Sequence, residues 1–303
     1  MPEPPAVAVC PACLGPESRA LGAKESWLLW ECRACRSIFT REEAAPGRLS
    51  ALYHECYVEE AAPPASAVAS LERLAAACEP YRRSGRWLDI GYGQGDLLEV
   101  VQRRGWSCYG TEVAPAALAR GARKGWTVGS DASGDPRFPA AGFDVVTMVE
   151  LIEHVPEPRR FLNAAAAWLR PGGLLYLTTP NSRSLNRRAL GLDWTIISPP
   201  EHLTLWTARA VRLALREAGL QPLRLRSEGL NPWEIVARFR RPAQGAPAYN
   251  RNEAAQQLSA ALSGGPLRRA FKGLANEVLT QLQLGDTLKA WAVRPAGEEE
   301  RRG

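Results

Sequence analysis

The sequence predicts a doubly wound α/β fold around a mostly parallel, seven-stranded sheet. Apolar runs of strand length alternate with helical patterns from Trp87 onwards, in the order that a parallel sheet with helices on both faces requires. The first run passes through a glycine-rich turn into the amphipathic pattern of residues 97–101. The chain has 303 residues, of which 46% are apolar, so it is long enough for one such domain with attached segments.

Four cysteines near the N-terminus form two CxxC pairs. Cys10 and Cys13 make the first pair, Cys32 and Cys35 the second, and the eighteen residues between the pairs match the spacing of a zinc ribbon. Four thiolates close a tetrahedral site that has no open position for catalysis. We therefore expect a structural zinc ion in a ribbon over residues 1–45, because so short a segment cannot bury a core of its own. Four free or redox-active thiols are the alternative.

Residues 46–84 are predicted to form a helical connector. Alanine and proline dominate its loops, and Leu71, Leu74 and Cys78 lie on one face of a helix that leads into the first strand of the sheet. A connector in this position can act as a lid over a bound ligand. Packing of its tyrosines against the domain is the alternative interpretation.

The turn after the first predicted strand has the form GxGxG. Gly91, Gly93 and Gly95 allow a tight turn and the close approach of a ligand. The dinucleotide-binding fingerprint looks similar, but Asp96 stands where its third glycine would be, and a carboxylate there would repel a pyrophosphate. Glu112 ends the second predicted strand, where it can accept both ribose hydroxyls. The pattern indicates a nucleoside ligand without phosphates.

Three further strands are predicted in the same sheet. The third ends at Asp131, the fourth ends at Glu150, and the fifth is the run GGLLYLTTP. Ligands of doubly wound sheets bind outside the carboxyl ends of the strands. We therefore expect Gly91, Glu112, Asp131 and Glu150 to meet in one crevice.

The last third of the chain is predicted to cover the substrate site. Residues 221–230 have the pattern of the sixth strand, and residues 285–296 contain the final one. The stretch between these two strands is far longer than a hairpin needs. We interpret residues 233–284 as an inserted helical cap that precedes the last strand, and residues 297–303 as a solvated tail.

Five motifs occur in a fixed order over about residues 85–230: LDIGYGQG, TEV, FDVVTMVELIEHV, LRPGGLLYLTTPN and PPEHLTLWTARAVRLALREAGL. Together they resemble the class I S-adenosylmethionine-dependent methyltransferases, and within them the ubiquinone O-methyltransferase-like branch. The resemblance implies a Rossmann-like core over residues 85–232 and S-adenosyl-L-methionine as the cofactor. Tyr92 departs from the small residue often found in this turn, so we expect the turn to differ slightly in shape.

The resemblance also implies a role for each matching residue. Asp89 and the glycine turn would hold the methionine end of the cofactor, and Glu112 would hold the ribose hydroxyls. Asp131 and Ala132 would line the adenine edge. Glu150 would help to close the pocket over the methionine moiety.

Two histidines are the candidate catalytic residues. Methyl transfer from a sulfonium is an in-line displacement that depends on alignment, and a hydroxyl acceptor also needs a base, which typically adds about 10²–10⁴-fold. His202 lies on a proline-rich loop after the fifth strand and is the first candidate, because histidine titrates near neutrality. His154, just past the fourth strand, is the second. The alternative for both histidines is a structural role, in which each side chain holds its own loop in place.

Composition and charge limit the partners and the location. The formal net charge is +6 and the pI is about 9.1, an excess that arginines spread along surface helices can supply without an anionic partner. The sequence has no signal-peptide pattern and no apolar run long enough to span a bilayer, so we expect a cytoplasmic protein.

The expected acceptor is a small molecule, a glycan or a lipid-linked precursor, methylated at a hydroxyl oxygen. A late strand after inserted helices resembles methyltransferases that act on such precursors. A zinc-ribbon-containing RNA base methyltransferase is the alternative, although the basic residues are scattered rather than gathered into one face. A non-catalytic module that binds the cofactor is the second alternative.

Overall fold

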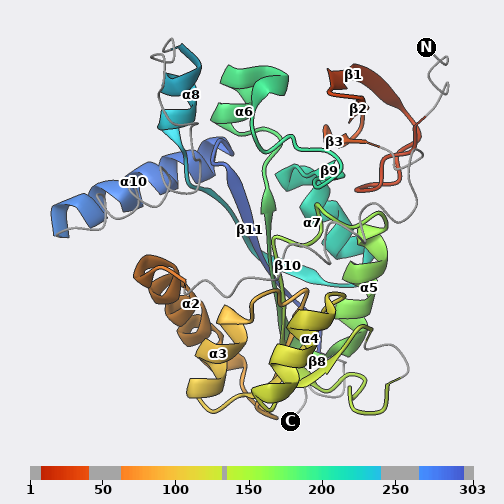
Figure 1. The fold of residues 1–303 in the computed structure, drawn as a ribbon, viewed down its shortest axis with the longest axis vertical. Coiled ribbons are helices and arrows are strands. Elements are labelled where there is room, and N and C mark those ends of the chain that lie inside the picture. Colours follow the sequence, from red (N-terminus) through yellow and green to blue (C-terminus); the bar gives the residue numbers. More distant parts are fainter. Residues whose placement is uncertain (1–7, 41–62, 132–134, 240–265, 297–303) are drawn as a thin grey trace.

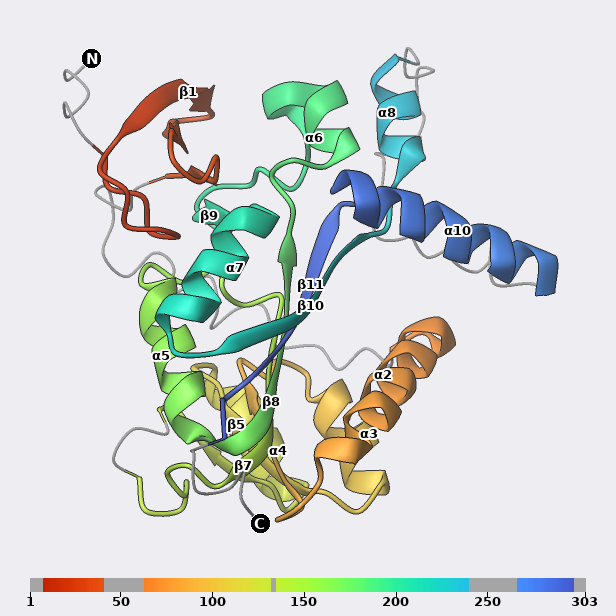
Figure 2. The same cartoon turned by 180° about the vertical axis from the view of Figure 1, so that it is seen from behind.

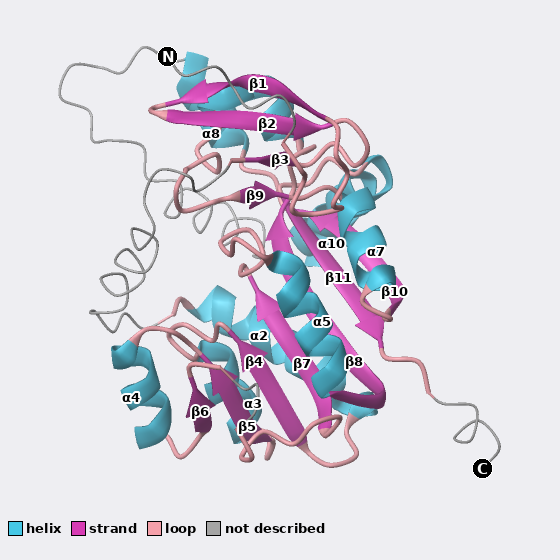
Figure 3. Cartoon of the chain, turned by 90° about the vertical axis from the view of Figure 1, so that its right-hand side faces the viewer, coloured by secondary structure: helices cyan, strands magenta, loops and turns pink. Residues whose placement is uncertain are grey.

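A computed structural model describes residues 8–40, 63–131, 135–239 and 266–296 of the chain. Figure 1 shows a large central sheet with helices around it and a smaller sheet near the N-terminus. The two sheets lie at opposite ends of the view in Figure 3, with the loops that follow the large sheet's strands between them.

The large sheet has seven strands in the order β10-β11-β8-β7-β4-β5-β6. From β8 to β6 in this order, each strand pairs in parallel with the next. Strand β11 runs antiparallel to both of its neighbours, β10 and β8. The predicted doubly wound, mostly parallel, seven-stranded sheet is confirmed. The strands are β4 (Arg86–Ile90), β5 (Ser107–Thr111), β6 (Thr127–Gly129), β7 (Phe143–Val149), β8 (Leu169–Pro180), β10 (Gln221–Glu228) and β11 (Thr287–Val293).

Helices cover both faces of this sheet. In Figure 2, α2 and α3 lie side by side on one face, and α5 and α7 lie side by side on the other. The helices are α2 (Ala65–Cys78), α3 (Asp96–Arg103), α4 (Pro115–Arg123), α5 (Pro158–Trp168), α6 (Leu185–Leu190), α7 (Ala208–Glu217), α8 (Pro232–Phe239) and α10 (Pro266–Leu282), with short 3-10 helices η1 (Glu79–Tyr81) and η2 (Gly191–Asp193).

Apolar periodicity explains these elements. Six of the seven residues of β7 are buried, as expected for a strand covered on both faces. In α3 the buried residues are Leu97, Leu98, Val100 and Val101, which is the helical face that the sequence predicted. Helix α7 begins after Thr207, whose hydroxyl accepts a hydrogen bond from the Ala210 amide and so caps the first turn.

The smaller sheet contains the N-terminal ribbon. Strands β1 (Ser18–Lys24), β2 (Trp27–Cys32) and β3 (Ile38–Phe39) form an antiparallel sheet, and β9 (Thr204–Leu205) adds a fourth strand to it. The ribbon is therefore joined to the rest of the protein by backbone pairing, which the predicted boundary at residue 45 did not anticipate.

Parts of the predicted connector and cap lie outside the described residues. Residues 46–62 of the connector and 240–265 of the cap belong to this group, whereas α2 and α10 fall within the predicted segments and α8 begins one residue before the predicted cap. Those segment boundaries stay predictions. Among the described helices, none combines the length and apolar character needed to cross a bilayer.

Candidate functional site

The glycine turn between β4 and α3 has the backbone form that only glycine adopts easily. Gly91, Gly93 and Gly95 have φ angles of +70°, +55° and +88°. A Cβ atom on Gly91 would lie 2.8 Å from the Cδ1 atom of Leu151, and one on Gly95 would lie 2.6 Å from the Trp126 ring. Larger residues are thus excluded from both positions. The Leu151 contact also brings the loop after β7 against the turn.

Tyr92 leaves the turn and is buried beneath α4. Its hydroxyl donates a hydrogen bond to the Ala117 carbonyl at 2.7 Å, and its ring meets Trp126 edge to face. A Cβ atom on Gly110 would lie only 2.4 Å from the Tyr92 ring. The large residue is therefore accommodated because a neighbouring strand has glycine at the point where the ring lies.

Glu112 lies beside the glycine turn, although it follows the next strand. It is 7% exposed, and its carboxylate accepts hydrogen bonds from the Gly93 amide at 3.1 Å and from the Val113 amide at 2.7 Å. Two of the predicted cofactor-binding elements thus meet at one edge of the sheet. The ribose-binding role of Glu112 stays a prediction.

Asp89 is a buried carboxyl at the end of β4. It is 3% exposed and accepts a hydrogen bond from the Thr147 hydroxyl at 2.6 Å. Burial raises the pKa of Asp89 to about 7, and the charge of Glu112 adds to the rise, while the Thr147 hydrogen bond opposes it. A positively charged ligand beside this carboxyl would favour its ionised form. Thr147 was not among the predicted site residues.

The remaining predicted cofactor residues are less enclosed. Asp131 is exposed, with one carboxylate oxygen 3.7 Å from the Arg160 guanidinium, and Ala132 lies outside the described residues. Glu150 is exposed after β7 with a φ angle of +49°, and its amide donates hydrogen bonds to the carbonyl and the hydroxyl of Thr178. The left-handed backbone at Glu150 turns the chain sharply at the strand end.

His154 and His202, the two candidate bases, lie together. Their ring centroids are 4.7 Å apart. The side chain of Glu153 lies beside them, and the three residues can offer ligand atoms within 4.8 Å of one another. His154 Nε2 lies 3.8 Å from Glu153 Oε1. Two loops that are far apart in the sequence therefore converge on one polar cluster.

Backbone carbonyls fix the orientation of both imidazoles. His154 Nδ1 lies 2.8 Å from the Glu201 carbonyl oxygen, and His202 Nδ1 lies 2.6 Å from that of Ile196. Because a carbonyl only accepts, each Nδ1 carries a proton and each neutral ring keeps its basic lone pair on Nε2. Burial lowers the pKa of His154, and the neighbouring His202 lowers it further. This arrangement suits proton removal near neutral pH.

Glu153 is a functional candidate that the sequence reasoning missed. It is fully buried, one carboxylate oxygen accepts from the Thr179 hydroxyl at 2.8 Å, and the other has no hydrogen-bond partner among the described residues. Burial, with the charge of Glu150, raises the pKa of Glu153 well above its ordinary range. The spacing ExxEH in ELIEHV was the available signal. A carboxylate with two imidazoles is also a set of atoms that can hold a divalent cation.

The four ribbon cysteines form one cluster. The Cys10 and Cys35 sulfur atoms are 3.6 Å apart, as are those of Cys13 and Cys32, and all four lie within 4.8 Å of one another. Sulfur atoms at about 2.3 Å from a tetrahedral zinc ion would be separated by about 3.8 Å. Burial raises the pKa of Cys13 to about 12, whereas the hydrogen bond with Cys10 lowers the pKa of Cys35 to about 5. A cation would favour the thiolate form of all four cysteines. The residues fit zinc.

The strand order, the glycine turn and the acidic residue after the second strand define the class of S-adenosylmethionine-dependent methyltransferases. The chain belongs to the methyltransferase domain family, whose model matches residues 59–225. It is thus an enzyme of the predicted class. The ribbon, residues 8–40, precedes the matched range.

Two relatives in sequence agree with this assignment. The ubiquinone biosynthesis O-methyltransferase of Cereibacter sphaeroides is 32% identical over 169 residues, which cover 50% of this chain and 68% of that protein. Its counterpart in Xanthomonas axonopodis pv. citri is 36% identical over 185 residues, 56% of this chain and 75% of that protein. A solved methyltransferase from Archaeoglobus fulgidus has a TM-score of 0.47 at 16% identity and covers 80% of this chain and 99% of its own.

Proposed function

We propose that the enzyme methylates a hydroxyl oxygen of a small-molecule, glycan or lipid-linked acceptor. The pair of imidazoles at His154 and His202 carries this proposal, because each ring presents Nε2 as a base and a hydroxyl nucleophile must lose a proton. The names of the relatives, which are O-methyltransferases of ubiquinone biosynthesis, support oxygen as the atom methylated.

The proposed cofactor site lies along the carboxyl ends of β4, β5 and β7. Asp89 and the turn at Gly91, Gly93 and Gly95 would hold the methionine end, and Glu112 would accept the ribose hydroxyls. The hydrogen bond between Glu112 and the turn, together with the burial of Asp89, supports this assignment. Asp131 and Ala132 would line the adenine, and Glu150 would close over the methionine moiety. Bound S-adenosyl-L-methionine supplies an electrophilic methyl group.

His202 is the first candidate for the base. It is partly exposed, and the Ile196 carbonyl holds its ring so that Nε2 is the basic atom. A hydroxyl proton would pass to Nε2 as the oxygen attacks the methyl carbon. His154, beside it, is the second candidate. Zinc bound by Cys10, Cys13, Cys32 and Cys35 is part of the proposal as a structural ion.

The test combines binding with turnover in the zinc-loaded protein. Calorimetric titration with S-adenosylhomocysteine should give one site, and Glu112→Ala should weaken it at least tenfold. A labelled methyl donor is then offered with catechols and other phenols, hydroxylated sugars and structured RNA. Labelling of a phenol or sugar that falls at least a hundredfold in His202→Gln, with unchanged S-adenosylhomocysteine binding, supports the proposal. Label that enters only RNA bases would overturn it.

A further inference from the structure

The N-terminal ribbon packs and pairs against the loop that carries His202. Strand β3 pairs with β9, with Ile38 opposite Leu205 and Phe39 opposite Thr204, and the Thr40 amide donates a hydrogen bond to the Leu203 carbonyl at 2.9 Å. β9 begins two residues after His202. The chain just beyond the candidate base is therefore held in the ribbon's sheet (Figure 3).

The chain before His202 also contacts the ribbon. Leu29 and Ile38 belong to the same buried apolar cluster as Trp194, Ile196 and Ile197, which precede His202 in the loop. A lysine of β1 adds a polar contact, because Lys24 Nζ donates a hydrogen bond to the Trp194 carbonyl at 2.9 Å. The loop is thus held at both ends by the same small sheet.

Thr207 connects this loop to a metal-binding knuckle. It is 1% exposed, and its hydroxyl donates a hydrogen bond to the Cys35 carbonyl at 2.7 Å while accepting one from the Ala210 amide. One hydroxyl therefore joins the knuckle to the start of α7.

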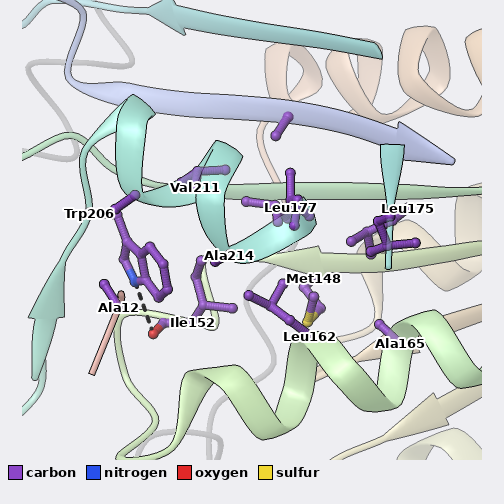
Figure 4. Packing of buried hydrophobic residues seen from close by; sticks show 14 of the residues in the cluster. Ala12, Met148, Ile152, Leu162, Ala165, Leu175, Leu177, Trp206, Val211 and Ala214 are labelled. Atoms are coloured by element: carbon purple, nitrogen blue, oxygen red, sulfur yellow. Dashed lines mark hydrogen bonds between the residues drawn. The ribbon is translucent and has the colours of Figure 1, made fainter. Parts of the chain in front are cut away.

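The other side of β9 contacts the loop that carries His154. The Leu203 and Thr204 amides donate hydrogen bonds to the Glu153 carbonyl at 2.8 and 3.1 Å. Trp206 donates from its indole nitrogen to the Ile152 carbonyl, and Ala12 of the ribbon lies beside its ring (Figure 4). β9 therefore lies between the ribbon and the polar cluster.

We propose that the ribbon is a positioning element of the acceptor site, which sets the orientation of His202 through the loop over residues 194–207. The Ile196 side chain lies in the ribbon's apolar cluster, and the Ile196 carbonyl fixes the His202 ring at 2.6 Å. The proposed cofactor residues Asp89 and Glu112 depend on β4 and β5 instead. This inference rests on the proposed function for the role of His202, but the ordering of the loop is measured independently of it.

The first test removes apolar packing between the ribbon and the loop and leaves the cysteines unchanged. Leu29→Ala removes a buried side chain from the apolar cluster that contains Ile196. Leu174→Ala is the matched control, because Leu174 is similarly buried in a cluster that contains no ribbon residue. In the full-length, zinc-loaded protein, Leu29→Ala should speed amide hydrogen exchange at residues 202–205 at least tenfold and lower kcat at least tenfold. Zinc content and S-adenosylhomocysteine affinity should stay within twofold of the parent, and the control should change neither exchange nor kcat.

The second test concerns Thr207 as a positioning residue. Thr207→Val keeps the shape but removes both the donor to Cys35 and the cap of α7, and Thr207→Ser keeps both; Thr207→Asn, which can still cap the helix, separates the two contacts. Faster exchange at residues 202–205 in the valine variant, restored in the serine variant, supports the proposal. Parental exchange in both Leu29→Ala and Thr207→Val would overturn it. A parent protein that methylates no hydroxyl acceptor would instead overturn the proposed function, while the exchange data still decide whether the ribbon orders the loop.

Discussion

In the proposed cofactor site, Asp89 is the residue at which a positive charge of the ligand should have the most direct effect. Its folded-state pKa of about 7 lies above its ordinary 3.8, so folding favours the protonated form and this cost to stability grows as pH rises from about 4 to 7. A ligand that carries an ammonium group favours the ionised form. Binding and burial therefore act on this carboxyl in opposite directions.

We predict that affinity for S-adenosylhomocysteine rises with pH up to about 7 and is level above it. The slope approaches tenfold per pH unit at most, because one proton is released from Asp89 on binding below its pKa. Calorimetry at pH 5.5, 6.5, 7.5 and 8.5 measures this. Asp89→Asn should bind more weakly at pH 8 and lose the slope; a slope that survives in Asp89→Asn would assign it to another group.

Glu153 shows what sequence reasoning could and could not find at this scale. Glu150 and His154, on either side of it, were identified because a strand end and a rare histidine are visible in the sequence. The burial of Glu153 and its contact with Thr179 depend on the packing of β7 against β8, which no local pattern encodes. Thr147 was missed for the same reason, since its role is set by the register of β4 and β7.

We predict that Glu153→Gln gains thermal stability relative to the parent as the pH rises, because burial raises the pKa of Glu153 and the glutamine resembles the protonated acid. The variant should, however, bind Mn²⁺ at least tenfold more weakly than the parent, since only a carboxylate can neutralise a cation held with His154 and His202. Electron paramagnetic resonance of free Mn²⁺ in zinc-loaded protein measures this. Equal Mn²⁺ binding by parent and variant would show that Glu153 is not a metal ligand, and the cluster would then act as a proton acceptor only.

At the scale of elements, β5 and α4 are joined to the glycine turn by the Tyr92 ring. The ring occupies the space beside Gly110 and Gly121, where added Cβ atoms would lie 2.4 and 2.9 Å from Tyr92 atoms. Strands β4, β7 and β8 of this sheet were predictable because their apolar runs are continuous and buried. β3 and β9 were not, because each has two residues and their pairing joins distant parts of the chain.

We predict that Gly110→Ala destabilises the protein by about 1–3 kcal/mol, because the new methyl group overpacks against the Tyr92 ring. Urea unfolding measures the loss. In a Tyr92→Ala background the same substitution should cost much less, since the ring it meets is gone. Additive losses in the double variant would show that the two positions do not interact.

At the scale of the whole molecule, the ribbon and the catalytic domain share a core. Cys10, Cys32 and Cys35 belong to the same buried apolar cluster as Trp206 and Val211 of the domain. A ribbon that folded alone would leave its apolar face in water, because so small a segment buries little. The fold therefore couples the cysteine cluster to the domain through packing and through β9.

We predict that removal of zinc lowers the melting temperature of the whole protein rather than releasing the ribbon alone. The metal stabilises the folded state by mass action, and the shared cluster transmits its loss to α7 and β9. Circular dichroism of the helices and the reactivity of the four thiols should report one common transition in both loaded and chelated protein. Thiols that become reactive at a temperature where the helical signal is intact would show that the ribbon unfolds on its own.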